Sequence, residues 1–470
     1  MGRFRNGVDG KDFVMKHTDI RDIFSKSELI DTIVTVCGWV RTSRDSKNIS
    51  FLEINDGTTL KHLQIVIEKE KVSDYDDAMK LGTSLKIVGK LVASQNNGVE
   101  INADEITVLG TCPADYPLQK KRHTLEFLRT MPHLRVRTNT FNAVFRVRSV
   151  LASAIHNYFQ SRGYVYVNTP IITGSDCEGA GEVFKVTTLG YNEEFKNAED
   201  YYANDFFGQK AGLSVSGQLE GEVAAMAFGK IYTFGPSFRA ENSNTPRHLA
   251  EFWHVEPEVA FAELPDIIEI AEDMIKNIIA AVLEKCPDEI AFFEKHFEAG
   301  LTEKLNGIIN NKFVILDYTD AIDLLQKTDV KFNYPCDWGC DLQTEHERYI
   351  TEQIFKKPVF VINYPKAIKS FYMKQNPDGK TVAATDLLVP GVGEIIGCSE
   401  READFDKLMN AINERGMNVA EYNDYIDLRK FGSVPHSGFG LGFERILMYC
   451  TGISNIRDVT LYPRTVGSVR

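Results

Sequence analysis

Short runs of alternating apolar and polar residues fill the first quarter of the chain. Five β-branched runs, separated by turn-forming stretches such as NDGT and QNNG, lie at residues 32–44, 49–56, 62–70, 85–93 and 99–110. Five short strands within about eighty residues favour a small closed barrel, for which the OB-fold is the usual five-stranded example. A fragment of a β-sandwich is the structural alternative. The stretch CPADYP, Cys112–Pro117, then breaks the pattern and marks a boundary.

A helix followed by a strand is predicted beyond this boundary. Apolar residues recur at helical spacing in residues 141–163, where Gly163 can end the helix. Residues 164–170 then predict a strand, which Pro170 closes. The character of the sequence therefore changes here.

The remainder of the chain predicts a sheet with helices around it. Strands are predicted in residues 230–262, on both sides of the polar loop AENSNTPRH, and in residues 358–365 and 385–399. Acidic helices are predicted at residues 264–297 and 401–426. The last segment, SGFGLGFERILMYCTG, predicts a strand, a glycine-rich turn and a helix. Because the strands do not alternate regularly with crossover helices, we expect an α+β fold with a mostly antiparallel sheet flanked by helices.

Length and charge set the expected domain organisation. A chain of 470 residues exceeds what one hydrophobic core usually organises, and 43% apolar with 25% charged residues is typical of a globular protein. We therefore expect a barrel domain with a short N-terminal extension at residues 1–112, a hinge at 113–137 and a larger domain at 138–470. Residues 118–137 carry six basic and one acidic residue, although the whole chain has a net charge of −13. Such a basic hinge can hold a polyanion locally, and a solvated linker is an equally good interpretation of charge alone.

The cysteines and apolar runs indicate the compartment. Eight scattered cysteines without a preceding secretory signal predict reduced thiols and a cytoplasmic protein. No apolar run approaches the ~18 residues that a membrane span needs. Cys336 and Cys340 in CDWGC could begin a metal site, but no second Cys/His pair lies at a suitable spacing, so we expect no zinc there.

Candidate chemistry begins in FRAENSNTPRHLAEFWHVEPE, Phe238–Glu258. Alternate residues of a strand share a face, so four side chains of its second half point the same way: Phe252, His254, Glu256 and Glu258. Two glutamates that face a core need a cation or a donor, and Arg239 ends the preceding strand. An aromatic ring, an arginine and carboxylates on one sheet surface suit a nucleotide with magnesium. A half-exposed hairpin with surface ion pairs is the alternative.

Two later segments add arginine and carboxylates. GFGLGFER, Gly438–Arg445, fits neither the Walker spacing nor GxGxxG, but it puts Arg445 in the first turn of a helix, where phosphate can bind. In DLLVPGVGE, Asp386 and Glu394 would lie at adjoining strand ends and could hold magnesium, unless they are ordinary acids of a hairpin. A regular strand would put Arg401 on the opposite face from Glu394, so one pocket can contain both only if a bulge or turn intervenes.

In this order, the segments resemble the three signature motifs of the class II aminoacyl-tRNA synthetases. Motif one is similar to RGYVYVNTP, Arg162–Pro170, which in that family helps to build a dimer interface. Motif two is similar to Phe238–Glu258 and motif three to GFGLGFER. With a barrel ahead of them, these motifs resemble subclass IIb, the aspartyl, asparaginyl and lysyl enzymes. The resemblance covers residues 20–470 and implies an anticodon-binding OB-fold, a catalytic domain and a homodimer.

The resemblance also implies a reaction in two steps. The carboxylate of an amino acid attacks the α-phosphate of ATP, which gives an aminoacyl-adenylate and pyrophosphate, and the acyl group then moves to the 3′ end of tRNA. Positioning and charge neutralisation suffice, so arginines and Mg²⁺ are expected instead of a protein nucleophile. By resemblance, Arg239, Glu394 and Arg445 are catalytic, and Glu394 and Asp386 hold the metal. ATP would contact Arg239, Glu241, Arg247, His248, Leu249, Phe252, Glu394, Gly442 and Arg445.

The choice of amino acid depends on VSGQLEGE, Val215–Glu222. Aspartyl enzymes have SPQLYKQ here, with a lysine that neutralises the substrate side chain, whereas this chain has Gly221. A pocket with Arg401 and Glu256 suits an amide, because Glu256 accepts from the NH₂ group and Arg401 donates to the oxygen. Together with SDCEGAGEVF and FGSVPHSGFGLGFER, this segment resembles the asparaginyl members, which implies L-asparagine and tRNA(Asn) as substrates. The implied asparagine contacts are Glu178, Ser216, Gln218, Arg239, Glu256 and Arg401.

In the barrel, Phe51 and Gln64 match subclass IIb positions that stack on and hydrogen-bond to the central U of the anticodon. Single-stranded bases are read in this way, by aromatic stacking and polar edges. Arg41, with Arg44 and Lys47, is then a candidate contact to the tRNA backbone. A phenylalanine of the barrel core is the alternative for Phe51.

Three other functions compete with an asparagine–tRNA ligase. The nearest is an aspartate–tRNA ligase with relaxed tRNA choice. A tRNA-independent enzyme that makes asparagine would lack the anticodon barrel, whose presence argues against it. A non-catalytic relative that binds RNA would be expected to lose Arg239, Glu394 or Arg445, and all three are present.

Overall fold

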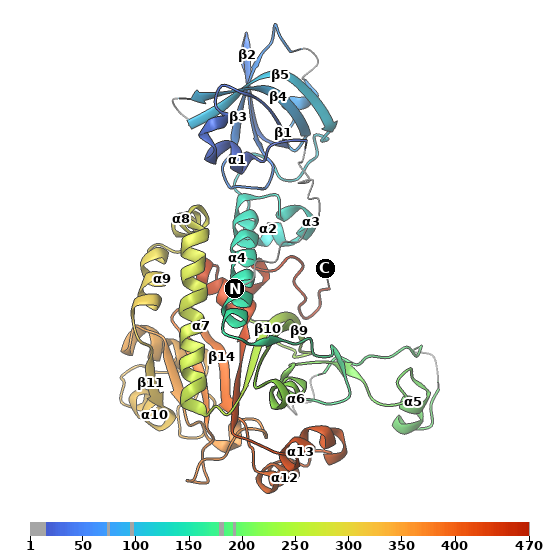
Figure 1. Cartoon of the computed structure of the whole chain (residues 1–470), viewed down its shortest axis with the longest axis vertical. Coiled ribbons are helices and arrows are strands. Elements are labelled where there is room, and N and C mark those ends of the chain that lie inside the picture. Colours follow the sequence, from blue (N-terminus) through green and yellow to red (C-terminus); the bar gives the residue numbers. More distant parts are fainter. Residues whose placement is uncertain (1–15, 73–75, 95–97, 178–182, 191–193, 470) are drawn as a thin grey trace, which may run out of the picture. The chain divides into compact units, whose positions relative to one another are not determined.

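The computed structural model describes residues 16–72, 76–94, 98–177, 183–190 and 194–469. It divides the chain into two compact units, Met1–Ala143 and Val144–Arg470, which have separate hydrophobic cores (Figure 1). Within the described ranges, no helix is long and apolar enough to cross a membrane.

The first unit contains a closed five-stranded barrel, preceded by the short helix α1 (Ile20–Ser25). Its strands pair in the order β1-β2-β3-β5-β4, and β4 closes on β1. In β3, Leu63, Ile65 and Ile67 are fully buried and alternate with less buried residues, so one face of each strand builds the core. The predicted OB-fold is confirmed, and the β-sandwich alternative is wrong. The strands are β1 (Ile33–Asp45), β2 (Ile49–Asn55), β3 (Leu63–Glu68), β4 (Ser84–Ser94) and β5 (Gly98–Gly110).

Helices connect the barrel to the second unit. The basic segment contains α2 (Leu125–Arg129) and α3 (Pro132–Arg135). The long helix α4 (Asn139–Ser161) begins in the first unit and continues in the second. It matches the helix predicted at residues 141–163, and Gly163 follows its end with a φ of 79°, a conformation that favours glycine.

An eight-stranded sheet forms the centre of the second unit, in the order β11-β12-β13-β14-β15-β10-β9-β6 (Figure 1). All neighbouring strands are antiparallel except the pairs β11–β12 and β6–β9, so the mostly antiparallel α+β fold is confirmed. The strand predicted at residues 164–170 is much shorter than expected. The strands are β6 (Val165–Tyr166), β9 (Lys230–Phe238), β10 (Glu251–Ala260), β11 (Val314–Asp317), β12 (Val359–Ile362), β13 (Ala384–Val389), β14 (Gly393–Glu400) and β15 (His436–Gly442). The strands β7 (Ile172–Thr173) and β8 (Gly212–Leu213) form a separate pair.

Helices pack against this sheet. The helix α7 contacts β14 and β15, α6 contacts β9 and β10, and α14 contacts β10 and β15. The helices are α5 (Ala198–Asn204), α6 (Gln218–Phe228), α7 (Leu264–Lys285), α8 (Pro287–His296), α9 (Leu301–Asn310), α10 (Tyr318–Gln326), α11 (Thr344–Arg348), α12 (Phe405–Glu414), α13 (Asn423–Lys430) and α14 (Phe443–Thr451).

Two predicted helices are wrong in their extent. Residues 264–297 form two helices instead of one, because Pro287 lacks the N–H that a continuous helix needs and starts α8 instead. Residues 401–426 become helical only from Phe405. Arg401 is extended and pairs with Met373, and this places it beside the sheet.

Candidate active site

A cavity of 480 Å³ in the second unit gathers nearly all the residues predicted for catalysis. It lies over β10, β13, β14 and β15, and the loop between β9 and β10 forms one of its walls. Glu178 lies outside the described residues. The other predicted residues of the catalytic domain all line the cavity: Ser216, Gln218, Arg239, Glu241, Arg247, His248, Leu249, Phe252, Glu256, Asp386, Glu394, Arg401, Gly442 and Arg445.

Arg239 and Phe252 face each other where β9 ends and β10 begins. The ladder pairs Phe238 with Glu251, and the Arg239 N–H donates to the Ala250 carbonyl at 3.0 Å. This register puts the Arg239 guanidinium carbon 5.4 Å from the centroid of the Phe252 ring, a cation–π contact. A planar base can therefore meet an aromatic surface next to a fixed positive charge.

Hydroxyl groups within the loop orient His248. Ser243 Oγ and Thr245 Oγ1 lie 2.9 and 2.6 Å from His248 Nδ1. Burial, followed by the positive charge of Arg445, lowers the pKa of His248. The neutral ring is therefore favoured at pH 7, and the two hydroxyls fix its orientation.

Arg247 reaches from the same loop to helix α11. Its Nη1 lies 3.2 Å from Thr344 Oγ1 and 3.7 Å from Glu347 Oε2. The pKa of Glu347 is raised to about 7, chiefly by burial and then by the negative charge of Glu394. An incoming phosphate would compete with this carboxylate for Arg247. The sequence prediction missed Glu347, because the segment QTEHERY, which contains it, belongs to none of the motifs.

Asp386 on β13 and Glu394 on β14 face the same glycine. A Cβ atom on Gly397 would lie 3.2 Å from Glu394 Oε1 and 3.8 Å from Asp386 Oδ1, so glycine leaves room between the carboxylates. Arg445 Nη1 contacts the Glu394 carbonyl at 2.9 Å and Glu394 Oε2 at 3.4 Å. Lys369, which was not predicted, lies with its Nζ 2.6 Å from Asp386 Oδ2.

These two carboxylates fit Mg²⁺, which prefers oxygen ligands and commonly takes one or two carboxylates together with substrate phosphates. Glu394 is the more available ligand, because Lys369 already neutralises Asp386. No group of three or more histidine, cysteine or acidic side chains that could hold a metal ion occurs in the described part of the chain. The phosphates of a nucleotide would therefore have to complete the coordination.

A bulge in β14 brings Glu394 and Arg401 to the same side of the sheet. The pairing of β14 with β13 passes from Ile396 directly to Glu394, so Ile395 is an extra residue without a partner of its own. The interruption that the sequence required is confirmed, and it lies at Ile395.

The glycines of GFGLGFER lie in a strand, so the predicted glycine-rich turn is wrong. The strand β15 extends to Gly442, and α14 starts at the next residue. A Cβ atom on Gly438 would overlap the carboxylate of Glu258, and one on Gly440 would lie 2.9 Å from His254 Nε2. Glycine is therefore needed here because the side chains of β10 extend across β15.

Glu256 occupies the amino-acid end of the cavity and is surrounded by donors. It accepts from the hydroxyls of Ser216 and Thr233 and from the Gly217 N–H, and His254 Nδ1 lies 3.2 Å away. Burial alone would raise the pKa of Glu256, but His254 and the hydrogen bonds outweigh it and lower the pKa to about 2. Glu256 is therefore a carboxylate at pH 7.

The carboxylate partner of Arg401 is Glu258 and not Glu256. Its Nε and Nη2 donate to the two oxygens of Glu258 at 3.2 and 2.5 Å, and its Nη1 donates to Ser399 Oγ at 2.6 Å. A Cβ atom on Gly221 would lie 3.5 Å from Glu258 Cγ. A lysine at this position, as in aspartyl enzymes, would therefore meet Glu258. The sequence prediction placed Glu258 on this face but missed it as a partner.

The predicted anticodon residues Phe51 and Gln64 lie on adjacent strands of the barrel. Phe51 is not part of the barrel core, so the alternative of a core phenylalanine is wrong. The Arg44 guanidinium carbon lies 4.9 Å from the centroid of its ring. Gln64 Nε2 donates to Glu100 Oε2 at 2.7 Å. The Phe51 ring, the Arg44 guanidinium and the Gln64 side chain are groups of the kinds that bind a single-stranded base.

Arg41 lies at a bulge of β1 and contacts the basic segment. Its guanidinium donates to the Arg137 carbonyl. It also lines a second cavity, of 470 Å³, in the first unit. The described residues around that cavity include no carboxylate but five arginines and lysines: Arg41, Lys120, Lys121, Arg122 and Arg137.

Two family models match the chain. The model for tRNA synthetases class II (D, K and N) matches residues 124–466, and the model for an OB-fold nucleic acid binding domain matches residues 34–109. The first match covers most of the second unit and the short helices before it, and the second match covers the barrel.

Individual relatives are similar over nearly the whole chain. The asparagine–tRNA ligase of Clostridium kluyveri is 54% identical over 462 residues, which are 97% of this chain and 99% of that protein. The asparagine–tRNA ligase of Clostridium tetani is 56% identical, with the same shares covered. The crystal structure of asparaginyl-tRNA synthetase from Pyrococcus horikoshii complexed with asparaginyl-adenylate has a TM-score of 0.85 at 34% identity, and the match covers 97% of this chain and 100% of that one. The chain therefore belongs to the class II tRNA synthetases of the D, K and N group and, within that group, to the asparagine–tRNA ligase family.

Proposed function

We propose that this chain is an asparagine–tRNA ligase, which activates L-asparagine with ATP and transfers it to the 3′ end of tRNA(Asn), releasing AMP and pyrophosphate. The observation that carries the proposal is that one cavity of the second unit has arginines and carboxylates suited to a nucleotide at one end and buried polar groups suited to an amide at the other. The asparagine–tRNA ligases that are more than half identical to this chain support the same activity.

The residues of the nucleotide end act by position and charge. Arg239 would bridge the α-phosphate of ATP and the carboxylate of asparagine, with the adenine on Phe252. Arg247, His248 and Arg445 would hold the outer phosphates, whose negative charge they match. When bound by Glu394 and Asp386, Mg²⁺ supplies further positive charge to the phosphates. These groups align the carboxylate for attack on phosphorus, and the leaving pyrophosphate departs from a site rich in cations.

The residues of the other end would select the amide. Glu256 is ionised and can accept a hydrogen bond from the NH₂ group, while Arg401 donates to the amide oxygen. The charge of Arg401 is already balanced by Glu258 at 2.5 Å, so the pocket offers no unpaired cation to the carboxylate of aspartate. Ser216, Gln218 and Glu178 would complete the contacts with asparagine. A wrong substrate would leave buried charges unmatched, which gives strong discrimination.

Amino-acid-dependent exchange of pyrophosphate into ATP tests this proposal. We expect exchange with asparagine and at least ~100-fold lower kcat/KM with aspartate, because a carboxylate would face Glu256. Exchange with aspartate at an equal rate would contradict the selection of an amide. Charging of tRNA(Asn) and tRNA(Asp) transcripts with labelled asparagine then separates a dedicated ligase from an enzyme with relaxed tRNA choice.

Substitution of Phe51 by alanine tests the anticodon contact in the barrel. We expect KM for tRNA(Asn) to rise about tenfold or more, because stacking on an aromatic ring contributes about 1–3 kcal/mol per base. Asparagine-dependent exchange, which needs no tRNA, should stay unchanged. Ile49→Ala on the same strand removes an exposed apolar side chain and is the matched control. Equal KM values for the Phe51→Ala and Ile49→Ala proteins would contradict the role of Phe51.

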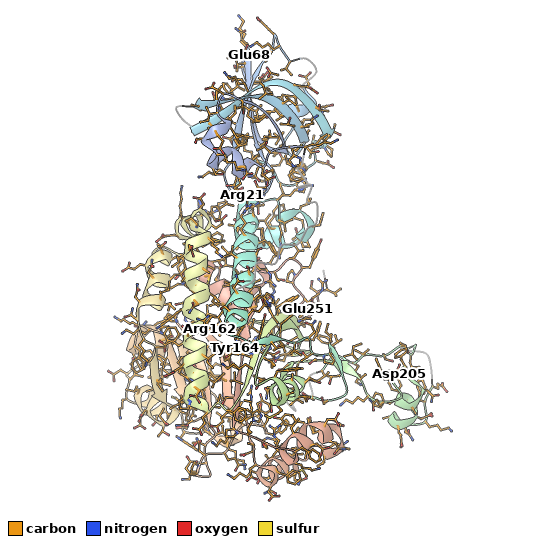
Figure 2. The ribbon with its side chains drawn as sticks, viewed as in Figure 1. Arg21, Glu68, Arg162, Tyr164, Asp205 and Glu251 are labelled. Carbon is orange, nitrogen blue, oxygen red and sulfur yellow. The ribbon has the colours of Figure 1, made fainter. Side chains whose placement is uncertain are left out.

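The proposal includes a homodimer formed through α4 and the motif-one strand. The edge strand β6 has one strand neighbour, β9, and apolar side chains near it are about two-fifths exposed, among them Tyr166 at 40% and Ile171 at 44%. At the end of α4, near Tyr164, Arg162 stacks over Tyr158 and binds Asp273 at 3.0 Å (Figure 2). Sedimentation velocity at micromolar concentration measures whether the chain is dimeric.

The proposed organisation is an anticodon-binding domain at residues 1–112, a basic hinge at 113–137 and a catalytic domain at 138–470. The basic cavity around Arg41 supports contact of this hinge with the RNA backbone. A cytoplasmic location is also proposed, which the eight free thiols support.

A further inference from the structure

Behind the amino-acid end of the cavity lies a buried carboxylate that is not itself a proposed substrate contact. Glu222, in α6, has no exposed surface and does not line the cavity. Its Oε1 accepts from Gln218 Nε2 at 3.0 Å and from the Tyr425 hydroxyl at 2.9 Å. Its Oε2 lies 2.8 Å from both Arg429 Nη2 and His436 Nε2. Glu222, Tyr425, Arg429 and His436 are together called the Glu222 cluster.

Glu222 is the carboxylate partner of a buried arginine and a buried histidine of this cluster. His436 Nδ1 lies 2.8 Å from the Val434 carbonyl and its Nε2 lies 2.8 Å from Glu222 Oε2. Burial alone would raise the pKa of Glu222, but the Arg429 guanidinium and the His436 ring outweigh it and hold that pKa well below its usual value. Loss of the carboxylate charge would leave the Arg429 guanidinium buried without this counter-charge.

The cluster contacts two residues that line the amino-acid pocket. Gln218 donates its side-chain amide to Glu222, and this contact fixes the orientation of the amide. Arg401 lies with its Nε 3.9 Å from Glu222 Oε1 while it binds Glu258, and its backbone N–H donates to the His436 carbonyl at 2.8 Å. One carboxylate therefore restrains both an amide and a guanidinium of the pocket from behind.

We infer that Glu222 is a positioning residue for amino-acid recognition, which orients the Gln218 amide and balances the charge of Arg401 so that the pocket prefers an amide to a carboxylate. The inference rests on the proposed function. Without the charge of Glu222, Glu258 would be the carboxylate left beside Arg401. The positive charge of Arg429 would remain nearby. The surplus of positive charge would then attract the side chain of aspartate.

The substitution Glu222→Gln tests this role, because it removes the charge and keeps the size of the side chain. In pyrophosphate exchange, we expect KM for asparagine to rise at least ~10-fold and the ratio of kcat/KM for asparagine over aspartate to fall at least ~10-fold. KM for ATP should stay within about twofold, since Glu222 lies behind the other end of the cavity. Glu269→Gln is the control, because it removes the same charge from an exposed position of the helix α7 and should keep the parent values.

A second variant covers the case in which Glu222→Gln does not fold. Tyr425→Phe removes one donor to Glu222 and keeps every charge, and we expect KM for asparagine to rise about threefold or more with an unchanged circular dichroism spectrum. Active-site titration separates the roles, because a merely structural residue would change the active fraction and leave KM for asparagine unchanged.

Two results would overturn the inference. One is a folded Glu222→Gln protein whose KM for asparagine and asparagine-to-aspartate ratio both stay within twofold of the parent. The other is an unfolded Glu222→Gln protein together with a folded Tyr425→Phe protein of unchanged KM. A parent protein without any asparagine-dependent exchange would overturn the proposed function itself, and this inference with it.

Discussion

Replacement of Arg239 by lysine is expected to lower asparagine-dependent exchange at least ~1,000-fold, mainly in kcat, as removal of an arginine from a phosphoryl-transfer site does. Lysine keeps the charge, but it cannot make the two parallel hydrogen bonds with which a guanidinium bridges a phosphate and a carboxylate. It also loses the planar contact with Phe252, whose ring centroid lies 5.4 Å away. The measurement is the rate of exchange at saturating ATP and asparagine.

Arg348→Lys is the matched control for this experiment, because Arg348 lies on the surface and forms an ion pair with Glu352. We expect parent kinetics for it. Thermal unfolding should give both variants melting temperatures within about 3 °C of the parent, since a lost cation–π contact costs only about 1 kcal/mol. An Arg239→Lys protein with more than a tenth of the parent rate would contradict the proposed bridging of phosphate and carboxylate by the Arg239 guanidinium.

Replacement of Gly221 by lysine is expected to turn the pocket toward aspartate. The new side chain would start 3.5 Å from Glu258 Cγ, and its ammonium group would draw Glu258 away from Arg401. Arg401 would then carry an unbalanced charge that suits a carboxylate. We expect the ratio of kcat/KM for asparagine over aspartate to fall at least ~100-fold, as measured by exchange with each amino acid.

Gly221→Ala separates the effect of charge from the effect of bulk. Its methyl group would make ordinary van der Waals contact with Glu258 and Ile231, at 3.5 Å from each, and alanine favours a helix by about 1 kcal/mol over glycine. We expect parent specificity and unchanged or higher stability. Equal losses of asparagine activity in the alanine and lysine variants would show that space, and not charge, decides the choice.

Local pattern was enough to predict the barrel and most of the catalytic site. Alternation of side chains along one strand placed Phe252 and Glu256 on a common face before any partner was known, because that face follows from strand geometry alone. The same rule showed that Glu394 and Arg401 require a bulge. The other residues of the site were predicted from the resemblance of their motifs to those of the class II synthetases, and those that the structure describes do line the cavity.

The contacts between side chains within the site could not be predicted from the sequence. Arg401 binds Glu258, 143 residues away, and not Glu256, because the choice between two glutamates of one face depends on how two strands cross in space. Glu222 ends the segment VSGQLEGE but was given no role there, and Lys369 belongs to none of the quoted motifs. Both are buried beside opposite charges, which only the structure shows. Propensity and spacing describe neighbours along the chain, whereas these contacts are fixed by tertiary packing.

The unpaired residue in β14 restricts how this enzyme can vary in length. Loss or gain of one residue between Glu394 and Arg401 would leave most of the hydrogen-bond ladder intact and still send one of these side chains to the opposite surface of the sheet. Changes of two residues would preserve the orientation of both. The segment is therefore constrained by whether its length is odd or even, and we expect a one-residue deletion here to put Glu394 and Arg401 on opposite surfaces of the sheet.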